Sequence, residues 1–244
     1  MKRDEALATL RGLGLREADV QTLYAHFDDC ERRGKHGHGH SRIAWLETVE
    51  FDSDAVPELL VAEDAYERWD GGEGLGYLVL AAVVRRLAER PPERVRLVAC
   101  SHTFPTGSLG YWARQAAAGG LVCVLTATSP RRLHHPAGGE PLTGTNPVAI
   151  AVPSSDGRPL VADVSMGAIT WGDVIAGRAA ADELVPFGGE QAHKAFALAA
   201  GLQLLVDALA GPEHGAVLVA ARPEHDPVPA FRELAAGLRL PGDA

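Results

Sequence analysis

The sequence has no surplus of basic charge. Its 244 residues include 23 lysines and arginines against 32 aspartates and glutamates, which gives a formal net charge of -9. The adjacent pair Arg131 and Arg132 is too small a cluster to cover a nucleic-acid backbone. Proteins that bind duplexes need a basic face that displaces counterions from the phosphates. We therefore expect no nucleic-acid partner.

Cysteine is also scarce. Cys30, Cys100 and Cys123 have neither metal-ligand nor disulfide spacing, and scattered free thiols are typical of a reducing compartment. The unbroken apolar stretches, residues 215–221 among them, are too short to cross a bilayer. Residues 1–5 do not lead into the apolar segment of a secretion signal. We predict a cytoplasmic protein with no membrane partner.

A dinucleotide-binding fingerprint is absent as well. A GxGxxG run after an apolar strand would predict a Rossmann fold. The nearest candidate, residues 72–76, has a different spacing and no apolar strand before it. The pattern of the sequence therefore predicts no Rossmann domain.

The sequence does contain enough apolar residues to form a core: 46% of its residues are hydrophobic and 23% are charged. Ser41 is a candidate N-cap for a helix that runs to Glu50, and a leucine stripe marks the last long helix at Leu198, Leu202, Leu205 and Leu209. The elements mix without strict alternation, which predicts one α/β domain over residues 1–244 with a helical segment at about 1–50. Periodicity and Gly or Pro stops predict helices at 4–11, 17–32, 77–89, 109–118 and 191–210, and strands at 95–100, 121–126, 148–152, 160–164 and 215–220.

A histidine-rich segment at residues 36–42 is the first candidate site. A histidine there can carry a proton near neutral pH, and the fork of Arg42 can hold a carboxylate bidentately. Three histidines at alternate positions would share one face of a strand and could bind a metal, although no Asp, Glu or Cys lies beside them to complete the shell. A solvated loop explains the pattern equally well.

Four further segments have polar residues where elements meet. The Gly, Thr and Asn run at 143–147 can present backbone N–H groups to an anion, and the helix entry at 188–194 suits a pyrophosphate. Asp163 ends a strand, and His102 lies in a polar loop between a strand and a helix. Each segment is explained equally well as an ordinary turn, cap or helix entry.

The order of these segments resembles the type 2 malate/L-lactate dehydrogenase family. Residues 33–43 (RGKHGHGHSRI) are similar to the family's RGHxSHGVxRL, and residues 104–110 (FPTGSLG) to its FHTGALG or NHFGAAG loop. Residues 138–153 resemble GG…GTNPxAxAxP, which is the most specific match. The similarity also includes residues 69–76 (DGxxGLG), 163–166 (DxAxS), 188–198 (GGxKGxGLA) and 240–242 (RLPG).

The resemblance implies a non-Rossmann α/β fold with a mixed sheet, flanking helices and its own site for NAD(H) or NADP(H). It also implies a homodimer and a small carboxylic acid substrate. Ungapped matching places His38, Gly37 and Arg42 in the substrate site. The positions that it assigns to the cofactor are Ser129, Thr145, Asn146, Asp163, Val164, Ser165, Gly188, Gly189 and Lys194.

Three departures from the family pattern bear on activity. Pro105 stands at the family's loop histidine, and Gly37 stands at the serine of its SHG motif. A segment between the DxAxS strand and the GG–Lys motif is missing, and it normally covers the active site. We therefore keep two alternatives: a shortened relative that binds cofactor or a partner without catalysis, and a metal module at His36, His38 and His40.

The main hypothesis is hydride exchange between a nicotinamide and C2 of a small 2-imino, 2-oxo or 2-hydroxy acid. His38 is the proton carrier, with His102 as second choice and Asp163 as helper, and Arg42 holds the carboxylate. Cyclic imino acids are the preferred substrates because the loop at 104–110 is closest to FHTGALG. An imine is already basic and needs less help with its proton than a ketone, so its reduction tolerates Pro105 better.

Overall fold

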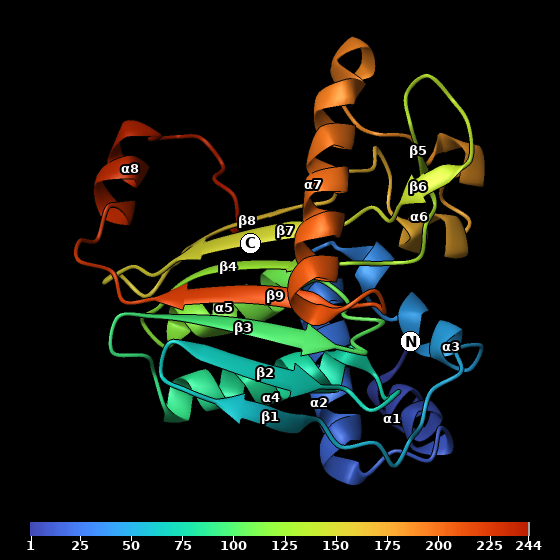
Figure 1. Cartoon of the computed structure of the whole chain (residues 1–244), viewed down its shortest axis with the longest axis horizontal. Coiled ribbons are helices and arrows are strands. Elements are labelled where there is room, and N and C mark those ends of the chain that lie inside the picture. The colour runs from blue at the N-terminus through green and yellow to red at the C-terminus, as the bar shows by residue number, and fades with distance from the viewer. Residues whose placement is uncertain (244) are drawn as a thin grey trace.

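The computed structural model describes residues 1–243 and is built on a seven-stranded mixed sheet (Figure 1). The strand order is β1-β2-β3-β9-β4-β7-β8; β2 and β3 run parallel and the other neighbours run antiparallel. A separate pair, β5 and β6, forms a small hairpin. The strands are β1 (Glu58–Ala62), β2 (Tyr66–Asp70), β3 (Val95–Ser101), β4 (Val122–Ala127), β5 (Leu133–His134), β6 (Pro141–Thr143), β7 (Val148–Val152), β8 (Leu160–Val164) and β9 (Ala216–Ala221).

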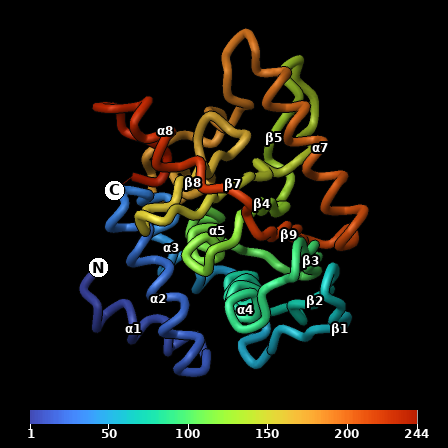
Figure 2. Tube along the Cα trace, turned by 90° about the vertical axis from the view of Figure 1, so that its left-hand side faces the viewer, coloured from blue at the N-terminus to red at the C-terminus, as the bar shows by residue number. Residues whose placement is uncertain are grey.

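Helices lie in layers on the two faces of this sheet, as the view along its edge shows (Figure 2). The helices α4 and α5 cover one face, and α1 and α2 pack behind them, whereas α7 lies against β3, β4 and β9 on the other face. The helices are α1 (Arg3–Gly12), α2 (Glu17–Arg32), α3 (Ser41–Leu46), α4 (Gly76–Glu89), α5 (Leu109–Ala118), α6 (Trp171–Ile175), α7 (Ala192–Ala210) and α8 (Val228–Leu234), with short 3-10 turns η1 (His36–His38), η2 (Ala181–Glu183) and η3 (Gly189–Gln191).

The predicted α/β class with a mixed sheet is confirmed, and the strongly periodic elements lie where the sequence put them. The helix at 17–32 and the strands at 148–152 and 160–164 have the predicted bounds. The strands β1 and β2 were missed because β1 (ELLVA) is a short apolar run without alternation and β2 (YERWD) carries three charged residues.

The predicted helix that starts at Ser41 is shorter than expected and differently capped. It ends at Leu46, not Glu50, and His40 is its N-cap residue. The Ser41 hydroxyl instead donates to the carbonyl of His36, which closes the preceding turn.

The last long helix buries a different face from the one its leucines suggested. Ala195, Ala199, Val206 and Ala210 of α7 pack inward, whereas Leu198 is 54% exposed and Leu205 is 45% exposed. Small side chains let the helix approach the sheet closely. Of the predicted stripe, Leu202 and Leu209 are half-buried against neighbouring clusters, whereas Leu198 and Leu205 remain exposed.

The segment Gly189–Ala210 is also long and apolar enough, by length and composition, to cross a membrane. The expectation that no such stretch exists was therefore wrong, because it counted only unbroken apolar runs. Core helices of globular proteins pass the same test, and here α7 packs against three strands of the sheet.

Candidate active site

A cavity of about 390 Å³ lies where the ends of β4 and β8 meet the turn η1, α3 and α6. The loop between β3 and α5 closes one side of it. Segments that are far apart in the sequence, from residue 34 to residue 178, therefore meet at this cavity. Its lining includes Lys35, Gly37, His38, Arg42, Trp45, Pro105, Ser108, Ser129, Arg132, Thr145, Asp163, Ser165, Trp171, Asp173 and Arg178.

His38 lies in this cavity at the end of the short turn η1, which is helical and not the strand that alternation suggested. Its Nδ1 atom is buried and has no hydrogen-bond partner within residues 1–243. Burial lowers the pKa of His38, and the nearby charge of Arg42 lowers it further, against the opposing effect of Asp163. The imidazole is therefore neutral at pH 7, and its Nδ1 is an unpaired buried polar atom.

Arg42 is buried and held in place without a carboxylate. Its Nε donates to the carbonyl of Gly37 at 2.8 Å, and the guanidinium carbon lies 4.6 Å from the centre of the Trp45 ring. Burial lowers the pKa of Arg42, which is the expected cost of removing a cation from water. Its two terminal nitrogens make no hydrogen bond within residues 1–243, and its role in holding a substrate carboxylate stays a prediction.

Asp163 is engaged with a residue that the sequence analysis missed. Lys35 Nζ lies 2.5 Å from Asp163 Oδ2, and the Ser108 hydroxyl donates to the same oxygen at 2.8 Å. Burial would raise the pKa of Asp163, but the charge of Lys35 and these hydrogen bonds outweigh it and lower that pKa. Asp163 is thus an ionised anchor for Lys35, which stands where RGHxSHGVxRL has its first histidine.

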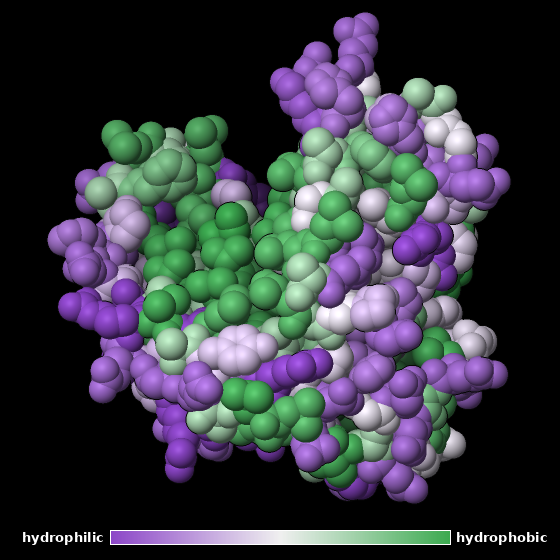
Figure 3. All heavy atoms as spheres, viewed as in Figure 1, coloured by the Kyte–Doolittle hydropathy of each residue, from purple (hydrophilic) through white to green (hydrophobic). Residues whose placement is uncertain are grey.

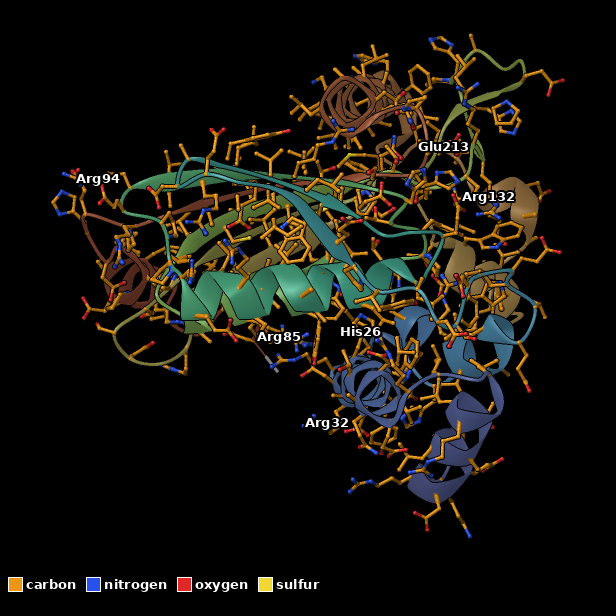
Figure 4. All side chains as sticks on the ribbon, turned by 60° about the horizontal axis from the view of Figure 1, so that its bottom comes forward. His26, Arg32, Arg85, Arg94, Arg132 and Glu213 are labelled. Carbon is orange, nitrogen blue, oxygen red and sulfur yellow. The ribbon has the colours of Figure 1, made fainter. Side chains whose placement is uncertain are left out.

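A second missed residue, His26 on α2, supports the loop behind the cavity (Figure 4). Its Nε2 accepts the backbone N–H of Ser108 at 3.1 Å. Burial lowers its pKa well below the ordinary value, so it is a neutral acceptor. The rings that enclose it belong to Phe27, Tyr77, Tyr111 and Trp112.

Four of the predicted cofactor residues, Ser129, Thr145, Asp163 and Ser165, line the cavity. Asn146 does not line it. Its side-chain nitrogen donates to the carbonyl of Ala199 and to Gln203, both at 3.0 Å, and its oxygen accepts the N–H of Ser129. Asn146 therefore fixes the Ser129 loop to α7, which explains the GTNP motif structurally.

Several other predicted residues lie outside the cavity lining. His102, which follows β3, is hydrogen-bonded through Nδ1 to the carboxylate of Asp70 at the end of β2, at 3.0 Å. The side chain of Val164 is exposed. Gly188, Gly189 and Lys194 lie at the exposed start of α7, so their contact with a pyrophosphate stays a prediction.

The three alternating histidines do not share a face. His36 bonds Glu31 at 2.8 Å and His40 stacks against Tyr24, while His38 belongs to the cavity. No cluster of metal-ligating side chains occurs within residues 1–243. The geometry therefore gives no support to the metal alternative.

Comparison with known proteins adds independent information. The model of the malate/L-lactate dehydrogenase family matches residues 3–183. A Δ1-pyrroline-2-carboxylate/Δ1-piperideine-2-carboxylate reductase of Pseudomonas putida is 29% identical over 228 residues, which cover 81% of this chain and 66% of that protein. A (2R)-3-sulfolactate dehydrogenase (NADP(+)) of Chromohalobacter salexigens is 30% identical over 187 residues, which cover 73% of this chain and 55% of that protein.

The fold is shared with solved structures. The Δ1-piperideine-2-carboxylate reductase of Pseudomonas syringae superposes with a TM-score of 0.81 at 23% identity, covering 98% of this chain and 89% of that one. A dehydrogenase of Sinorhizobium meliloti gives a TM-score of 0.82 at 22% identity, covering 99% of this chain and 87% of that one. The chain spans from about half to two thirds of the length of the first curated relatives that it matches.

Proposed function

Because the chain belongs to the malate/L-lactate dehydrogenase family, we propose that it exchanges a hydride between a nicotinamide cofactor and C2 of a small 2-imino, 2-oxo or 2-hydroxy acid. The observation that carries the proposal is the pairing, in one cavity, of an uncompensated buried Arg42 with a neutral His38 whose Nδ1 has no partner. An acid substrate would give Arg42 a carboxylate to bind and His38 an atom with which to exchange a proton.

In this proposal Arg42 holds the substrate carboxylate through its free terminal nitrogens. When the hydride adds to C2, the electron pair of the C=O or C=N bond moves onto the oxygen or nitrogen. In reduction the imidazolium form of His38, which a carboxylate bound beside Arg42 favours, gives that atom its proton and returns to the neutral imidazole. In oxidation the neutral imidazole removes the proton from the hydroxyl or amine. The ion pair of Lys35 with Asp163 positions the wall of the cavity beside His38.

We place the nicotinamide ring in the part of the cavity lined by the predicted cofactor residues. Ser129, Thr145 and Ser165 offer hydroxyls there, and Pro130 and Pro147 offer apolar surface, which matches a flat ring with one carboxamide. A nicotinamide bound there would supply or accept the hydride.

Cyclic imino acids stay the first substrates to test, on the strength of the loop at residues 104–110. Pro105 lines the cavity and carries no proton that it could deliver. An imine nitrogen is basic enough to need little further help. Oxo acids would depend more heavily on His38.

Turnover is the direct test. NADH or NADPH at millimolar concentration is expected to raise the melting temperature, because a ligand that binds only the folded state stabilises it. Adding Δ1-pyrroline-2-carboxylate, Δ1-piperideine-2-carboxylate or an oxo acid should then lower the absorbance of the reduced cofactor. Stabilisation by cofactor without turnover of any of these acids would favour a non-catalytic relative.

We also propose that two copies associate through the uncovered face of the sheet. Adjacent strands expose Val124, Ile150 and Val164 there. Leu198 and Leu205 are also exposed on α7, which packs against β4. Figure 3 shows this apolar surface between α7 and α8. A contiguous apolar patch is costly in water, and a twofold contact would cover it on both copies.

Light scattering at micromolar concentration is expected to give twice the monomer mass of 25.8 kDa. Ile150→Lys should shift the protein to monomer, whereas a lysine at the exposed Leu60 on β1 should leave the dimer intact. A wild-type monomer would contradict the proposal.

A further inference from the structure

The charges that line the cavity do not balance. Lys35 is paired with Asp163 at 2.5 Å, and Arg178 is paired with Asp173 at 3.0 Å. Arg42 and one further cation have no carboxylate within 4.0 Å in residues 1–243. That second unpaired cation is Arg132, and it lies in the same cavity.

Arg132 is held in the cavity by its backbone and by an aromatic ring. Its N–H donates to the carbonyl of Thr143 at 2.9 Å. Its guanidinium carbon lies 4.1 Å from the centre of the Trp171 ring, at the start of α6. Its side-chain nitrogens make no hydrogen bond to residues 1–243.

Arg42 and Arg132 therefore have similar surroundings in the cavity. Each guanidinium lies over a tryptophan of the cavity wall, Trp45 for one and Trp171 for the other. Stacking on a ring uses the face of the guanidinium and leaves its N–H edge for an anion. Burial lowers the pKa of Arg132, and the charge of Arg42 lowers it further, as expected for two cations that line one cavity.

We infer that Arg132 determines substrate specificity by binding a second anionic group, while Arg42 binds the carboxylate next to C2. The substrate class is then a small 2-oxo or 2-imino acid with a second carboxylate or sulfonate. A monocarboxylate would satisfy Arg42, but the half-buried Arg132 would then face the cavity without a carboxylate partner. This inference rests on the proposed function and narrows it.

The experiment compares matched substrates that differ only in the second acid group. Δ1-piperideine-2-carboxylate is paired with Δ1-piperideine-2,6-dicarboxylate, and 2-oxobutyrate with oxaloacetate. Each is assayed with wild type, Arg132→Gln and Arg131→Gln. Arg131 is the matched control because it is exposed and lies outside the cavity lining.

In wild type, kcat/KM should be higher for the diacid of each pair. In Arg132→Gln, kcat/KM for the diacids should fall by roughly 10- to 100-fold, the loss expected for one charged hydrogen-bonding partner, while the monoacids change less than about twofold. Arg131→Gln should match wild type. An equal fall for both members of each pair would overturn the inference. So would a raised KM for NADH or NADPH alone, which would assign Arg132 to a cofactor phosphate.

A binding measurement separates this inference from the proposed function. Calorimetry with malonate and acetate needs no turnover, and the inference predicts that wild type binds malonate more tightly and that Arg132→Gln loses the difference. If malonate binds in this way but no acid is reduced, the proposed function fails and the two-anion site stands. If acetate and malonate bind alike, the two-anion site fails even when monoacids are turned over.

Discussion

Replacing His38 with alanine should lower kcat by roughly 100- to 10,000-fold, the range typical of losing a general acid–base group. The variant should keep its affinity for cofactor. Of the two proton carriers considered from the sequence, His38 alone lines the cavity, and its Nδ1 has no protein partner. No other histidine in the cavity can replace it, because His36 is bonded to Glu31.

His102→Ala is the matched control for this experiment. Its imidazole is bonded to Asp70 and lies outside the cavity lining, so the variant should retain wild-type kcat. Full activity in His38→Ala together with loss in His102→Ala would transfer the proton role to His102. Loss in both variants without a change in melting temperature would also contradict the single-carrier mechanism.

The pH dependence gives the same prediction a second readout. Burial and the charge of Arg42 lower the pKa of free His38, so it remains a competent base below pH 6.5. In the oxidation direction, kcat/KM should therefore stay level through that pH and fall only in more acidic solution. A bound carboxylate offsets the charge of Arg42, so the acidic limb of kcat should lie at higher pH than that of kcat/KM.

Replacing Arg42 with alanine should raise KM for the acid substrate by roughly 10- to 100-fold, with a smaller effect on kcat. A charged hydrogen bond contributes about 1.5–3 kcal/mol, and each 1.4 kcal/mol is about tenfold in affinity. The KM for NADH or NADPH should stay near wild type because the proposal assigns the cofactor to Ser129, Thr145 and Ser165 and not to Arg42. Steady-state kinetics with each substrate varied in turn measures both effects.

Arg42 also bonds the carbonyl of Gly37, so its loss could loosen the turn that carries His38. Arg42→Lys is therefore the control, since it keeps a charge but not the planar fork. We expect Arg42→Lys to recover part of the substrate affinity at an unchanged melting temperature. A fall in kcat as large as the rise in KM would show that Arg42 acts mainly by positioning His38.

Many of the helices and strands could be predicted from the local sequence pattern. Helix α5 and strands β7 and β8 have the predicted bounds because apolar periodicity and Gly or Pro stops act over a few residues. The buried face of α7 was not accessible in the same way. Its leucines form the obvious stripe, but the sheet selects the alanine face, and that choice depends on the surface it packs against.

The candidate site likewise has residues that short motifs predict and contacts that only the folded chain reveals. The sequence by itself determined the family resemblance and placed Arg42, His38 and Ser129 as site residues, because these depend on short motifs in a fixed order. Only the tertiary structure decided that Lys35 meets Asp163 across 128 positions of sequence, that His102 stays outside, and that Arg132 faces the same cavity as Arg42. Charge balance in a cavity is a property of distances between segments remote in the chain, and no local pattern encodes those distances.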